Sequence, residues 1–102
     1  MKYKLIFFIS IFTSSSVLLA RDAAAGKRKS SMCASCHGYK GISSNPSYPN
    51  LAGQKKAYLI NAMQAYKSGQ RTGRQADIMA SISLGLSKQD IKDLAEYYSR
   101  LK

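Results

Sequence analysis

The chain has few of the residues that cross-link or interrupt small domains. Its 102 residues include two cysteines, one histidine and two prolines. Because the cysteines are only three residues apart, they cannot close the long loops of a disulfide framework. A structural zinc site takes four ligands, and cysteine and histidine together supply only three here. No stretch after residue 20 alternates apolar and polar residues as a strand would, so the sequence predicts an all-α domain.

Long apolar runs are missing as well. The apolar residues 5–12 are followed by a Thr-Ser run and fall short of the roughly 20 residues that span a bilayer. A basic start at Lys2 and Lys4 and a small-residue exit ending at Ala20 complete the pattern of a secretory signal peptide. We expect residues 1–20 to be this signal and 21–102 to form one domain in the periplasm, with no stable membrane insertion after cleavage. Cleavage after Ala24 or Ala25 also satisfies the pattern, and an uncleaved anchor is the alternative.

Acidic residues are scarce. Five Asp and Glu face sixteen Lys and Arg, and the formal charge falls only from +11 to +9 when Lys2 and Lys4 are removed. One interpretation is a solvated surface that keeps the protein soluble. The other is a docking face for an acidic partner, which makes association dependent on salt. No array of basic residues interleaved with stacking aromatics indicates nucleic acid as a partner.

The most specific motif is Cys33-Ala34-Ser35-Cys36-His37, which contains the only histidine. Side chains at i and i+3 of a helical turn lie on one face, so Cys33 and Cys36 can both reach one porphyrin and form thioether bonds. His37 then lies under the iron as its proximal ligand. A thioredoxin-like dithiol would need a βαβ pattern that is absent. A short disulfide between Cys33 and Cys36, in a haem-free secreted dithiol or binding protein, is the remaining alternative.

Helical patterns surround this motif. We expect a first helix from an Asp22 cap to Met32, a long loop over 38–54 that contains both prolines, and a helix from about Lys55 to Gly69. Residues 70–76 read as a linker, followed by one or two helical turns that end near Gly85. The last helix has the clearest start: Ser87 with Asp90 resembles a capping box, Leu86 can pack on Ile91, and the helix should run for about 14 residues.

The iron needs a sixth ligand, and after the leader only methionines remain as candidates. Met32 adjoins Cys33 and is on the same side of the haem as the attachment turn. Met63 lies on the apolar face of its predicted helix, where methionine usually fills core space. We favour Met79, which follows well downstream in a less regular segment. The alternative is that Met79 packs in the core while water or nothing occupies the sixth position.

Taken in order, the residues after the leader resemble the class I c-type cytochromes, the small monohaem proteins of the bacterial periplasm. The resemblance implies a cytochrome c fold of three to five helices around one haem c, with the terminal helices crossing at Gly26 beside Tyr97 or Tyr98. It also implies that the Pro49 carbonyl accepts a hydrogen bond from His37, and that Tyr58 and Arg71 contact a haem propionate. Lys40, Lys55 or Lys56 would lie near an exposed haem edge. The matching residues are 22–27, 33–38, 49–54, 58–59, 68–71, Met79, 86–87, 90–91 and 97–98.

His/Met ligation fills both axial positions and raises the reduction potential, which suits electron transfer and disfavours catalysis at the iron. The sequence therefore predicts a periplasmic one-electron carrier, not an enzyme, that shuttles electrons between redox complexes. The alternative is a haem-bearing subunit of a larger enzyme, such as a sulfide-oxidising flavoprotein complex.

Overall fold

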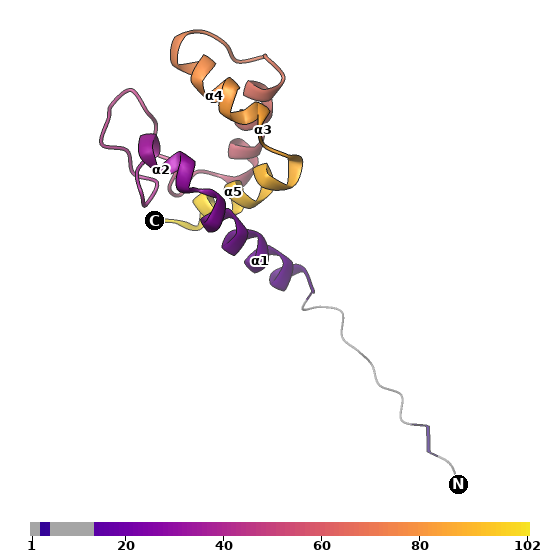
Figure 1. The fold of residues 1–102 in the computed structure, drawn as a ribbon. Helices are drawn as coiled ribbons and strands as arrows, with labels where there is room; N and C mark the ends of the chain where they lie inside the picture. The colour runs from indigo at the N-terminus through magenta and orange to yellow at the C-terminus, as the bar shows by residue number, and fades with distance from the viewer. Residues whose placement is uncertain (1–2, 5–13) are drawn as a thin grey trace.

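The computed structural model describes residues 3–4 and 14–102; the predicted apolar centre of the leader and Lys2 lie outside them. The described residues contain helices and no strand, as an all-α fold requires. None of the helices found there is both long and apolar enough to cross a membrane. The helices are α1 (Ser14–Lys29), α2 (Ser31–His37), α3 (Lys56–Lys67), α4 (Arg74–Leu84) and α5 (Lys88–Arg100), which Figure 1 shows in order of colour.

The first predicted helix is wrong at both ends. α1 begins at Ser14, so Asp22 lies inside the helix and caps nothing. The residues before Asp22 include leucine and alanine, which are good helix formers and continue the helix upstream. At the other end the helix stops at Lys29, and the Ser30 hydroxyl donates to the Lys27 carbonyl at 2.7 Å. The haem-attachment motif therefore lies in a separate short helix, α2.

α1 crosses α5 at Gly26, and Figure 1 shows the two helices lying against each other. A Cβ atom on Gly26 would lie 2.0 Å from the Asp93 carbonyl oxygen and 2.7 Å from the Tyr97 Cβ. No side chain fits at such distances, so only glycine allows this approach of the two backbones. The small residue and its aromatic neighbour Tyr97, both implied by the resemblance, are present at the crossing.

α5 begins as predicted. The Ser87 side chain accepts from the Asp90 amide while the Asp90 carboxylate accepts from the Ser87 amide, which completes the capping box. Leu86 and Ile91 are both buried in one cluster, as the predicted staple requires, and α5 has 13 residues against about 14 expected. The buried apolar residues of this cluster are Leu59, Leu86, Ile91, Leu94, Ala95 and Tyr98.

The prediction for α4 is wrong in its start and length. The helix begins at Arg74 and runs for 11 residues, not the one or two turns expected from its apolar residues. Asp77 explains the earlier start, because its carboxylate accepts a hydrogen bond from the Gly73 amide at 2.9 Å and satisfies a free donor at the helix N-terminus. α3, by contrast, lies within the expected range, and Gly69 follows it with a positive φ of 79°.

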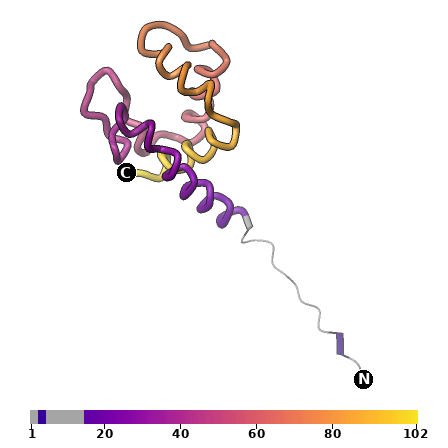
Figure 2. Tube along the Cα trace, in the orientation of Figure 1, coloured from indigo at the N-terminus to yellow at the C-terminus, as the bar shows by residue number. Residues whose placement is uncertain are grey.

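The predicted loop over 38–54 contains no helix or strand, and it folds back on itself between α2 and α3 (Figure 2). The Gly41 carbonyl accepts from the Leu51 amide at 2.8 Å and from the Ala52 amide at 3.0 Å. The Gly53 amide then donates to the Tyr98 carbonyl at 3.0 Å. These bonds close the loop and attach its second half to α5.

Ion pairs tie α5 to the helices on either side. Lys29 of α1 pairs with Asp90 at 2.8 Å and also with Asp93, whose side chain is buried. Glu96 pairs with Lys56 of α3 and with Arg100, both at 2.8 Å. Burial alone would raise the pKa of Glu96, but the hydrogen bonds from Lys56 and Arg100 lower it overall. The hydrogen bond from Lys29 is the main cause that lowers the pKa of Asp90 to about 2.

We expect Lys29→Met to destabilise the protein by about 1–3 kcal/mol at pH 7, because it leaves a buried carboxylate short of a partner. The lowered pKa of Asp90 contributes stability that is present above its ordinary value of 3.8 and is lost as the pH falls towards 2. The variant should therefore lose less stability between pH 5 and pH 2 than the wild type. Urea unfolding followed by circular dichroism measures the stability at pH 7 and its change with pH. Lys27→Met is the control, because it removes the charge of an exposed neighbouring residue on α1. Equal acid sensitivity in variant and wild type would contradict the assignment.

Candidate haem site

A cavity of about 340 Å³ opens between α2, the loop after it, α3 and α4. This volume lies within the range of roughly 300–1,000 Å³ of small-molecule and cofactor sites. Aliphatic, aromatic and methionine side chains form much of its wall, with a few polar groups among them. The residues that carry the argument below are Met32, Cys33, Cys36, His37, Tyr48, Pro49, Tyr58, Met63, Tyr66, Arg71, Met79 and Tyr98.

His37 is the last residue of α2, and its side chain is buried. Its Nδ1 lies 2.8 Å from the Pro49 carbonyl oxygen, which is the contact implied by the resemblance. Because a carbonyl oxygen only accepts, Nδ1 must carry the proton and donate it. In the neutral ring this leaves Nε2 with a free lone pair, which is the state a metal-binding imidazole needs.

Cys33 and Cys36 both line the cavity, and no disulfide joins them. Burial raises the pKa of the Cys33 thiol as it stands before haem attachment, and its hydrogen bond with Tyr98 only partly opposes this. Burial and the neighbouring Cys33 also raise the pKa of Tyr98. No group of three or more Cys, His, Asp and Glu residues in the described chain is arranged to hold a metal ion, so the zinc alternative has no ligand set there.

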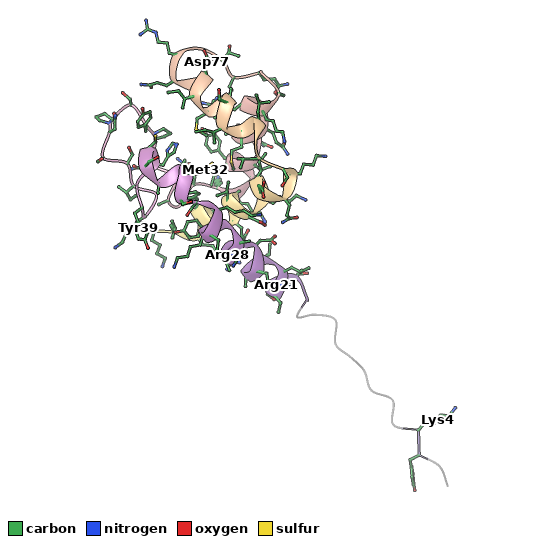
Figure 3. The ribbon with its side chains drawn as sticks, viewed as in Figure 1. Lys4, Arg21, Arg28, Met32, Tyr39 and Asp77 are labelled. Carbon is green, nitrogen blue, oxygen red and sulfur yellow. The ribbon has the colours of Figure 1, made fainter. Side chains whose placement is uncertain are left out.

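Three methionines from three helices line the cavity: Met32 of α2, Met63 of α3 and Met79 of α4. Met32 shares its helix with His37, as expected for a residue on the attachment side, and Figure 3 labels it on α2. The sequence favours Met79 over Met63 as the sixth ligand partly because the segment around Met79 has a less regular pattern. The structure removes that distinction, because α4 is a regular helix and both sulfur-bearing side chains line the same cavity.

The polar residues of the wall fit the expectations in part. Tyr58 and Arg71, which the resemblance assigns to a propionate, both line the cavity, and Arg71 stacks on the Tyr66 ring with its Cζ 4.4 Å from the ring centre. None of the three lysines expected near the haem edge, Lys40, Lys55 and Lys56, is among the lining residues. Tyr48 and Tyr66 do line it and were not predicted as site residues; Tyr66 falls on the same apolar helix face as Tyr58 and Met63 in the sequence, whereas Tyr48 carries no signal beyond its aromatic ring.

The residues present fit a haem. Two thiols and an imidazole lie at one wall with the spacing that covalent attachment needs, and the helices across the cavity add two methionine side chains and apolar surface. The imidazole already has the hydrogen bond that orients a metal-binding ring.

Comparisons with known proteins agree with this fit. The sequence pattern of the cytochrome c family matches residues 23–102. The chain is 49% identical over 80 residues to cytochrome c-554(548) of Halomonas halodenitrificans, covering 78% of this chain and 96% of that protein. It is 42% identical over 83 residues to cytochrome c4 of Pseudomonas aeruginosa, covering 81% of this chain but only 40% of that protein.

Among solved structures, the fold matches cytochrome c4 of Acidithiobacillus ferrooxidans, for which a complex-induced tuning of electron transfer has been described. The TM-score is 0.71 at 29% identity, over 78% of this chain and 49% of that one. The chain thus spans half or less of the cytochromes c4 that it matches. It belongs to the cytochrome c family as a class I c-type cytochrome, an electron carrier with one haem c bound covalently through Cys33 and Cys36.

Proposed function

We propose that the protein is a periplasmic one-electron carrier whose haem iron is held by His37 and Met79 and which shuttles electrons between redox complexes. One observation carries the proposal: a single cavity brings together the cysteine pair, the imidazole fixed by Pro49 and the Met79 side chain from a different helix.

Bound haem c supplies a one-electron couple between ferric and ferrous iron. The protein's own residues would set its properties. Pro49 holds the His37 ring through the 2.8 Å hydrogen bond and fixes which nitrogen can bind the metal. Met79 would supply a second protein ligand to the iron, and the apolar wall would keep water away. With both ligands supplied by the chain, the iron would have no site open for oxygen or peroxide, which favours a carrier over an enzyme.

The alternative role, as a haem subunit of a larger enzyme, has no observation in its favour. The relatives described above are named as cytochromes, and none of those names states an enzyme subunit. A stable stoichiometric complex with a flavoprotein on purification would support the subunit role instead.

Spectroscopy tests the ligand assignment. The purified protein should keep its haem colour on a denaturing gel, because thioether bonds survive unfolding. The reduced form should show a sharp low-spin c-type spectrum, and the oxidised form a weak methionine-to-iron band. A high-spin spectrum would remove methionine as a ligand and reopen catalysis at the iron.

The periplasmic location is part of the proposal and depends on the leader. Cleavage after Ala20 would cut α1 but leave Gly26 and the α1–α5 crossing in the remaining chain. Protein from the periplasmic fraction should therefore begin at Arg21 in N-terminal sequencing. An intact leader on the haem-bearing protein would support the anchor instead.

Charge supports an acidic partner. Every acidic side chain of the chain has a partner within it: Asp77 caps α4, Asp22 is hydrogen-bonded to Gln89, and Asp90, Asp93 and Glu96 are ion-paired. Exposed basic side chains have no such balance, and Figure 3 shows Arg21 and Arg28 along α1 among them. Asp22 and Asp77 keep their negative charge because their partners are uncharged, but the other three acids are ion-paired, so the surface presents a net positive charge.

We expect this charge to appear in electron-transfer rates measured with two small redox reagents of opposite charge. Oxidation of the reduced protein by anionic hexacyanoferrate(III) should slow as salt is added, because attraction is screened. Oxidation by a cationic tris(phenanthroline)cobalt(III) complex should speed up. Stopped-flow measurements from about 10 mM to 200 mM salt, where the screening length falls from about 30 Å to under 10 Å, cover the change. Equal salt responses with the two reagents would contradict a positive docking surface.

A further inference from the structure

The cavity holds two methionines across from the attachment helix, not one. Met63 on α3 and Met79 on α4 both line it, and the two helices pack against each other. If Met79 is the sixth ligand, as proposed above, a second thioether of the same chemistry lies in the same cavity. The helix that carries Met63 is held to the rest of the protein differently from the helix that carries Met79.

α3 is held to the body of the protein at two points. It packs against α5 as well as α4, and Lys56 at its start pairs with Glu96 of α5. Met63 itself packs against the buried core cluster, to which Leu59 of the same helix belongs. Met63 therefore stays at the cavity as long as the core is folded.

α4 is held more weakly. Among the helices of the described chain it packs against α3 alone. Its Leu84 side chain is 67% exposed, and the Ser83 hydroxyl is buried without a hydrogen-bond partner among the described residues, which makes its packing less favourable. The residues before the helix are exposed, whereas Leu86 just after it is buried in the core. α4 is thus anchored to the core at its C-terminal end, and its N-terminal part is held by α3 and, through the cavity-lining side chains Ile78 and Met79, by the haem.

We propose that Met63 is a reserve axial ligand, which binds the haem iron when movement of α4 withdraws Met79. In the exchange the bond from iron to the Met79 sulfur breaks and a bond to the Met63 sulfur forms. Both thioethers are neutral, so no proton or electron is transferred and the oxidation state of the iron is unchanged. The exchange keeps the iron low-spin and closed to small ligands during the movement of α4.

Four variants of the holoprotein test the inference: Met79→Ala, Met63→Leu, their double variant, and Met79→Ala with Met32→Leu as a matched control on α2. The oxidised spectrum of Met79→Ala should keep part of the methionine-to-iron band, and the double variant should lose it and become high-spin. The Met32→Leu control should keep the band. Imidazole should bind Met79→Ala about tenfold more weakly than the double variant, because Met63 competes for the iron.

A second measurement needs no loss of Met79. Imidazole should bind Met63→Leu several-fold faster than wild type at equal global stability, because the iron is then uncovered whenever α4 moves. The inference is overturned if Met79→Ala and the double variant have the same spectrum and imidazole affinity, or if Met32→Leu removes the band. Loss of the band in Met63→Leu alone, with Met79→Ala unaffected, would overturn the assignment of Met79 in the proposed function as well.

Discussion

Replacing Gly26 by alanine should destabilise the protein by about 3 kcal/mol, at the upper end of what overpacking a core usually costs. The new Cβ would lie 2.0 Å from the Asp93 carbonyl oxygen, 2.6 Å from its carbon and 2.7 Å from the Tyr97 Cβ. Two of these neighbours are backbone atoms, which cannot turn aside as a side-chain tip can. The only relief is to move α1 away from α5, and this would weaken the pairing of Lys29 with Asp90 and Asp93.

The midpoint of thermal unfolding, followed by circular dichroism, should fall by on the order of 15 °C in a domain of this size. Gly85→Ala is the matched control, because its Cβ would meet only the Ile82 carbonyl oxygen, at an ordinary 3.5 Å, and its φ of −81° suits any residue. We expect the control to change stability by less than about 0.5 kcal/mol. A Gly26→Ala protein as stable as the control would mean that the helices do not cross this closely.

Replacing both Cys33 and Cys36 by alanine should abolish covalent haem attachment and, with it, most of the folded structure at 25 °C. The cluster of buried apolar side chains in the described chain has only six members. Leu59, Leu86, Leu94 and Tyr98 of that cluster also line the cavity of about 340 Å³, so much of the apolar surface gathered by the fold faces the haem. A chain of this size buries little surface of its own and depends on such a group for stability.

The measurements are haem staining on a denaturing gel and the far-ultraviolet circular dichroism of the same sample. Ser35→Ala is the matched control, because Ser35 lies between the two cysteines on α2 but is exposed; it should keep both the stain and the helical signal. Stain retained by the double variant would place the attachment elsewhere. A cooperative unfolding transition in the haem-free variant would show that the helices form a core without the haem.

The sequence by itself determined the features that depend on neighbours a few residues apart. The Cys33–His37 motif specifies its cofactor by spacing alone, and the capping box of Ser87 and Asp90 sets the start of α5 through contacts three residues apart. A single polar side chain predicted a helix start less reliably, because it can bond to several different partners. Asp22 looked like a helix cap but lies within α1, and the effect of Asp77 on the start of α4 was missed.

Only the tertiary structure decided which distant residues meet. Lys29 and Asp93 are 64 positions apart, and the approach of Gly26 to Asp93 requires α1 and α5 to be packed before it has any meaning. The wall of the cavity also depends on the tertiary structure. An apolar helix face predicts that the face is buried, but it does not predict whether core side chains or a cofactor cover it. Met63 looked like core filling for that reason, whereas the packing of α3 on α4 places it with Met79 around one cavity. Short-range hydrogen bonds and spacings are encoded locally, but burial against a particular partner depends on where the whole chain puts that partner.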